Sequence, residues 1–104
     1  MSWLVLVLSG ALEAVWAVAL DKSAGLSRLV PAAVFFTGLA ASMTGLAYAM
    51  RELPVGTAYA VWVGIGAVLT AAYSTAVGDE PLTAGKGLFL ALIIGGVVGL
   101  KLVG

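Results

Sequence analysis

Four long apolar runs constrain the fold of this chain more than any other feature. The first three, residues 3–20, 29–50 and 53–78, are each long enough to cross a hydrocarbon core as a helix, which takes about 20 residues. The fourth, residues 87–100, is shorter, but Lys86 and Lys101 at its ends can extend to the membrane surfaces. We therefore expect one domain over residues 1–104, with transmembrane helices at about 3–20, 30–50, 55–77 and 82–103.

Composition limits the chemistry that these helices can perform. The chain is 62% hydrophobic and 10% charged, which is typical of an integral membrane protein. It has no Cys and no His, and its net charge is zero, so we expect no metal, no cofactor and no nucleic-acid partner. Since it has no nucleotide-binding loop and no catalytic triad, we also expect neither an enzyme nor an ATP-driven pump.

The connections between the runs are short, at residues 21–28, 51–52 and 78–80. Such connections make consecutive helices antiparallel neighbours, and we expect a compact four-helix bundle with both termini on one side. One side would carry Lys22, Arg28 and Lys86; the other would carry Arg51, Lys101 and the amino terminus. This balance predicts no preferred orientation, so oppositely inserted copies could form an antiparallel homodimer. Weak effects could instead select one orientation. The charge count does not distinguish this possibility from insertion in both orientations.

Glu13 is the only charged residue in the first run and lies near its middle. Because a carboxylate at that depth costs about 2.5–3.5 kcal/mol to insert, it marks a functional site by default. The alternative is that it satisfies a neighbouring polar group inside the bundle. No Lys, Arg or His lies inside another run to be its permanent partner, so we favour the functional interpretation.

Other candidate residues lie on the same side of the first helix or in the later helices. Gly10 and Trp16 share the Glu13 face, although a Trp near the end of a span is equally typical of the interfacial aromatic belt. In the third run, Tyr59 and Trp62 face one way and could bind a carboxylate or a cation. The remaining candidates are Ser42, which could instead bond its own helix; Gly64 and Gly66, for close packing or a bend; and Gly96 and Gly99, for helix association.

Desolvation favours the protonated form of a carboxylate that has no counter-ion, and the same carboxylate can hold a cation instead. Mutually exclusive occupancy combined with alternating access would give proton/cation exchange. Aromatic ring faces favour an organic cation over sodium.

At these residues the chain resembles the small multidrug resistance family along nearly its whole length. The matching features are Glu13, the pattern Pro54-x-Gly56-x-Ala58-Tyr59-Ala60-x-Trp62-x-Gly64-x-Gly66, and Glu80-Pro81-Leu82 before the last run. The resemblance implies a multi-pass protein of the bacterial inner membrane that works as a proton-coupled antiporter. It also implies an antiparallel homodimer of dual topology, in which both copies of Glu13 bind proton and substrate.

The subtype that exports guanidinium is the more similar one, because Trp16 stands where quaternary-ammonium exporters carry glycine and Lys101 follows Gly99-Leu100. By this resemblance, Trp16 and Ser42 hydrogen-bond and orient the substrate. Tyr59 gates the two copies of Glu13, Trp62 lines the substrate site, and Gly10 leaves room for the substrate. Phe89 departs from the helix-association motif of multidrug members, although Gly96-Val97 matches it.

The leading interpretation is therefore a guanidinium/proton antiporter. The alternatives are a broader exporter of multidrug or quaternary ammonium cations, a passive small-ion channel, and a proton-carrying rotor subunit. Guanidinium favours the first because its N–H groups match carboxylate oxygens two at a time.

Overall fold

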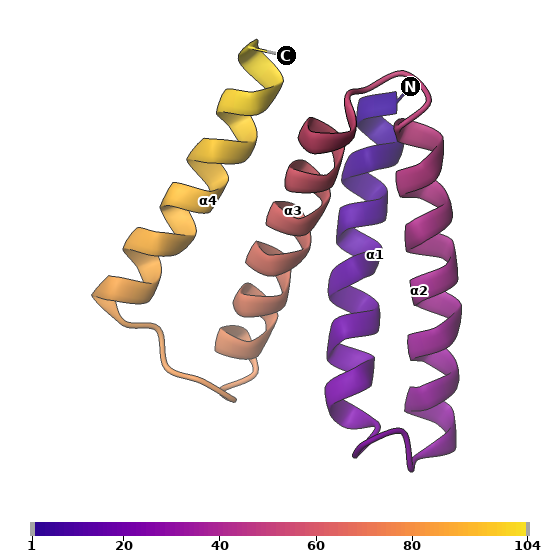
Figure 1. Cartoon of the computed structure of the whole chain (residues 1–104). Coiled ribbons are helices and arrows are strands. Elements are labelled where there is room, and N and C mark those ends of the chain that lie inside the picture. Colours follow the sequence, from indigo (N-terminus) through magenta and orange to yellow (C-terminus); the bar gives the residue numbers. More distant parts are fainter. Residues whose placement is uncertain (1, 104) are drawn as a thin grey trace.

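The computed structural model describes residues 2–103, and these form four helices. Their bounds are α1 (Ser2–Lys22), α2 (Leu29–Ala49), α3 (Val55–Ala76) and α4 (Ala84–Val103). Each helix occupies one apolar run and is long and apolar enough to cross a membrane. The protein is thus an all-α, multi-pass membrane protein. The start of α1 and the end of α4 lie at the same end of the structure (Figure 1), as the antiparallel connections predict.

Helix α1 stands between α2 and α3, and α4 lies on the far side of α3 (Figure 1). Within residues 2–103 the backbone of α4 packs against α3 alone, and α2 makes few contacts with α3 although a short loop joins them. The expectation of a compact four-helix bundle is therefore wrong for the single chain. In lipid no hydrophobic force drives an apolar helix against its neighbours, so packing depends on where small residues allow close approach.

Small residues create the close approaches that this packing requires. At Gly10 of α1, an added Cβ would lie 2.8 Å from Cβ of Ile65 on α3. At Gly64 of α3, it would lie 2.7 Å from Cγ2 of Val97 on α4. Between α1, α2 and α3 the core is small. It consists of Leu6, Leu46, Ala49, Ala58, Val61 and Trp62.

The helix ends have local causes. After α1, the Ser23 hydroxyl donates to the Leu20 carbonyl at 2.7 Å and accepts from the Leu26 amide at 2.9 Å. Gly78, with φ of 83°, follows α3 in the left-handed region that favours glycine. Thr83 caps the last helix, because its hydroxyl accepts from the Lys86 amide at 3.1 Å. The last helix consequently begins at Ala84 and not at residue 82 as predicted.

Candidate functional site

Glu13 lies where α1 and α3 are in contact, and its carboxylate rests against the backbone of Gly66. A Cβ added at Gly66 would be 2.5 Å from Cδ of Glu13 and 2.8 Å from its Cγ, and it would collide with Oε1. The side chain of Glu13 therefore occupies the space that the missing Gly66 side chain leaves. Gly66 is a close-packing position, one of the two roles that the sequence allowed for it.

No group within residues 2–103 neutralises Glu13. The structure records no hydrogen bond to its carboxylate there, and the ion pair found among those residues joins Lys86 to Glu80 at 2.7 Å, outside the helix core. Glu13 is half-buried in the single chain. The described part of the protein thus holds a carboxylate at mid-span that is open to a proton or a cation.

Ser42 joins three helices through its hydroxyl group. It donates to the main-chain carbonyl of Ser9 on α1 at 2.6 Å and accepts from Nε1 of Trp62 on α3 at 3.0 Å. The Ser42 side chain is fully buried. The hydroxyl therefore bonds to neighbouring helices and not to its own, which was the alternative for a lone serine in a membrane helix.

Ser9 belongs to this network, although the sequence did not single it out as a site residue. Its hydroxyl donates to the Val5 carbonyl at 2.8 Å, and an added Cβ at Gly45 would collide with that hydroxyl. Gly38 plays the same part for Trp16, since an added Cβ there would lie 3.0 Å from Cβ of Trp16. The signal for these contacts was available in the sequence, because the two glycines lie about one turn to either side of Ser42.

The Trp16 indole packs between α1 and α2. Its ring meets Phe35 edge-on, with centroids 5.8 Å apart, and its N–H is buried with no acceptor among residues 2–103. A buried indole donor one turn from Glu13 is thus available to a partner or a ligand. The whole side chain of Trp16 is partly exposed in the single chain.

Tyr59 and Trp62 lie together on α3, as their spacing predicts. Their ring centroids are 5.8 Å apart, but Trp62 is buried whereas Tyr59 is 53% exposed.

Gly10 opens no cavity, because Ile65 fills the space beside it. Gly96 and Gly99 of α4 have no atom within 4 Å of an added Cβ among the residues described. The glycine face of α4 is therefore uncovered in the single chain.

Comparison with known proteins identifies this architecture. Residues 1–93 match the family described as Small Multidrug Resistance protein. The chain belongs to the small multidrug resistance family. Two similar relatives are both named "Guanidinium exporter". The chain is 49% identical to that of Yersinia pseudotuberculosis and 50% identical to that of Escherichia coli K12. The alignments cover 98% of this chain, and 98% and 97% of those relatives.

Membership in the small multidrug resistance family makes the protein a membrane transporter and not an enzyme. The family match extends from the start of α1 into α4. It therefore contains Glu13, Ser42, Trp62 and Gly66, which the structure brings to the region where α1, α2 and α3 meet.

Proposed function

We propose that this protein exports guanidinium across the bacterial inner membrane in exchange for protons, and that both bind in turn to Glu13. One observation carries the proposal: a carboxylate in the middle of a span has no ion pair or hydrogen bond within residues 2–103. A proton and a cation compete for such a group, so an antiporter needs only that each occupied form can change the side to which it opens. The bacterial relatives named "Guanidinium exporter" support the substrate and the membrane.

The hydrogen-bond donors and acceptors around Glu13 determine which groups can contact the substrate in the proposed site. Guanidinium carries only donors, so it bonds to the acceptor oxygens of Glu13. The indole N–H of Trp16 is also a donor, so the hydrogen bond to the substrate that the family resemblance implies for Trp16 cannot form with this cation. We therefore assign this N–H to a Glu13 carboxylate, which it would orient. Ser42 already accepts from Trp62 and retains a second lone pair that could accept from the substrate.

The other candidate residues have proposed roles around Glu13 and Ser42. Trp62 lines the site with its ring, and the exposed Tyr59 beside it gates the two copies of Glu13. Gly64 and Gly66 lie two residues apart where α3 meets α4 and α1, so a bend in α3 at this pair would move both contacts together.

The functional unit in this proposal is an antiparallel homodimer of dual topology. The single chain leaves the glycine face of α4 uncovered, including Gly96 and Gly99. Small residues on a membrane helix allow the close backbone approach that drives helix association. The equal numbers of basic groups at the two ends also support insertion in both orientations.

The experiment that tests the proposal is uptake into proteoliposomes under an imposed pH gradient, with guanidinium, methylguanidinium and tetraethylammonium compared. We expect guanidinium to be concentrated and the accumulation to collapse with the gradient. A passive channel would give no uphill movement. Movement of tetraethylammonium alone would instead identify a quaternary ammonium exporter, and Trp16→Gly should gain that activity if Trp16 narrows the site.

A second experiment tests the dimer. Tags on the two ends of the chain should be found on both sides of the membrane in comparable amounts. A single orientation would rule out the antiparallel arrangement, and a large ring on sizing would favour the rotor subunit.

A further inference from the structure

An apolar groove crosses the side of α1 that faces away from Glu13. Because successive residues turn about 100° around a helix, Val15 and Lys22 lie on the side of α1 opposite Glu13. The groove has a volume of about 520 Å³, within the range of small-molecule sites. Its lining is almost wholly apolar. It consists of Ala14, Val15, Val18, Ala19 and Lys22 of α1, Val30, Pro31 and Val34 of α2, and Leu69 and Tyr73 of α3.

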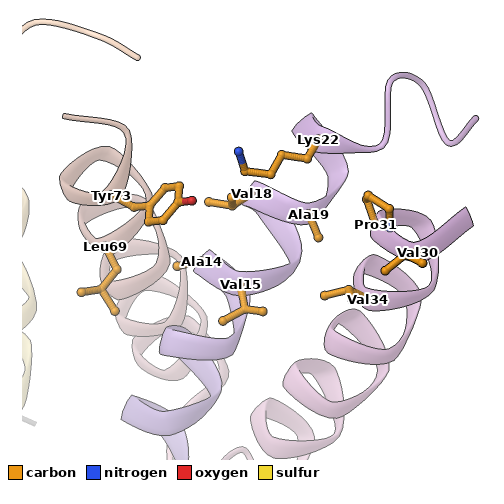
Figure 2. Close-up of a pocket in the computed structure, with 10 residues that line it drawn as sticks. All are labelled: Ala14, Val15, Val18, Ala19, Lys22, Val30, Pro31, Val34, Leu69 and Tyr73. Atoms are coloured by element: carbon orange, nitrogen blue, oxygen red, sulfur yellow. The ribbon is translucent and has the colours of Figure 1, made fainter. Parts of the chain in front are cut away.

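Figure 2 shows that one charged group lies at the end of this groove. Lys22 lies at its end, at the last turn of α1, and its side chain extends above Val18 toward Tyr73. From Ala14 to Lys22 the groove follows α1 for about 12 Å, at 1.5 Å per residue. It therefore runs from the middle of the span to the level of the membrane surface, which matches an aliphatic chain with a polar head.

A polar cavity of about 710 Å³ adjoins the groove and shares Val18, Lys22 and Tyr73 with it. This cavity contains three carboxylates, those of Asp21, Asp79 and Glu80. Lys86 pairs with Glu80, whereas Asp21, Asp79 and Lys22 have no ion pair within residues 2–103. One free cation and two free carboxylates thus lie around the end of an apolar groove.

We propose that the groove binds one acyl chain of a phospholipid whose headgroup carries both a phosphate and a primary ammonium. The phosphate contacts Lys22, and the ammonium contacts Asp21 and Asp79 in the adjoining cavity. Charge complementarity decides the class of lipid. The two carboxylates repel a headgroup with net negative charge, and a quaternary ammonium cannot donate hydrogen bonds to them.

The test is native mass spectrometry of the full chain released from nanodiscs that contain equal amounts of phosphatidylethanolamine, phosphatidylcholine and phosphatidylglycerol with identical acyl chains. We expect phosphatidylethanolamine to be retained preferentially. Lys22→Gln should lower its retention about fivefold, the effect of one basic group at a membrane surface. Lys101→Gln is the matched control, because that lysine lies at the other end, over the Trp3 ring at 5.0 Å from its centroid.

A second pair of variants tests the groove itself. Val18→Phe should reduce retention by filling the groove, whereas Val7→Phe, on α1 outside the groove lining, should not. Equal retention of the three lipids, preference for phosphatidylglycerol, or an equal loss in Lys101→Gln would overturn the proposal. Since the chain has no cysteine, Val15→Cys gives a clean cross-linking site. Efficient disulfide formation between copies in membranes would show that a second chain fills the groove instead.

Discussion

The carboxylate of Glu13 on α1 lies against the backbone of Gly66 on α3. The charge on which the proposed mechanism depends is thus positioned by the absence of a side chain on another helix. Because Glu13 has no ion pair within residues 2–103, its position depends on this fit and not on a counter-ion.

Gly66→Ala should therefore displace the Glu13 carboxylate. Apparent substrate affinity should fall roughly tenfold or more, because charge-assisted hydrogen bonds contribute about 1.5–3 kcal/mol each. The measurement is guanidinium binding or uptake by the reconstituted protein, with thermal unfolding recorded in parallel. Gly56→Ala is the control, since an added Cβ there meets nothing within 4 Å. Unchanged substrate affinity in Gly66→Ala would show that transport does not depend on the contact between Glu13 and Gly66.

Glu13→Gln should abolish coupled transport and leave insertion and assembly intact. The amide keeps the size of the side chain but cannot exchange a proton or balance a cation. Uptake in proteoliposomes should fall to the background of empty vesicles. Glu52→Gln, at an exposed position between α2 and α3, should transport normally. Uphill exchange that persists in Glu13→Gln would contradict the proposed mechanism.

Ser42→Ala should destabilise the packing of α1, α2 and α3 by about 1–2 kcal/mol, because it leaves the Ser9 carbonyl and the Trp62 indole N–H without their bonds. Unfolding in detergent or bicelles measures the loss. Thr44→Ala is matched to it, since that hydroxyl bonds the Ala40 carbonyl of its own helix at 2.7 Å and is exposed. The double variant Ser42→Ala/Trp62→Phe should cost less than the sum of the single changes. Additive losses would mean that the shared bond is absent in the membrane.

Between α3 and α4, Glu80 forms an ion pair with Lys86 in the first turn of α4. The hydrogen bond from Lys86 and its positive charge lower the pKa of Glu80 below the ordinary value of 4.5. A lowered pKa in the folded protein contributes stability above pH 4.5, and this contribution is lost as the pH falls through the lowered value. Lys86→Gln should return the pKa toward 4.5, as followed by NMR titration of the side-chain carboxyl. Lys101→Gln should leave it unchanged, and an equal shift in both variants would argue against the ion pair.

Much of this architecture could be predicted from local sequence patterns. Four apolar runs predicted four helices, and short connections predicted antiparallel neighbours with both ends together. Glu13 was recognisable because a charge inside an apolar run is expensive in lipid. These inferences hold because the length of an apolar run and the presence of a charge within it can be read directly from the sequence.

The contacts between helices were not predictable in the same way. Apart from Glu13 and a few hydroxyl groups, each span is apolar on every side, so no amphipathic pattern shows which face packs and which meets lipid. Ser42 could have bonded its own helix, Gly66 could have marked only a bend, and α4 was expected inside the bundle. In the structure, Ser42 bonds to Ser9 and Trp62, Gly66 packs against Glu13, and the backbone of α4 packs against α3 and not against α1 or α2.

The sequence by itself determined how many helices cross the membrane and which residue carries the charge within them. Tertiary structure alone decided which neighbours surround that charge, because close approach between membrane helices depends on the matching of small and large side chains across separate spans. Gly66, Gly45 and Gly38 leave space for the side chains of Glu13, Ser9 and Trp16 on another helix. Such a match between glycines and larger side chains exists only after the helices have packed.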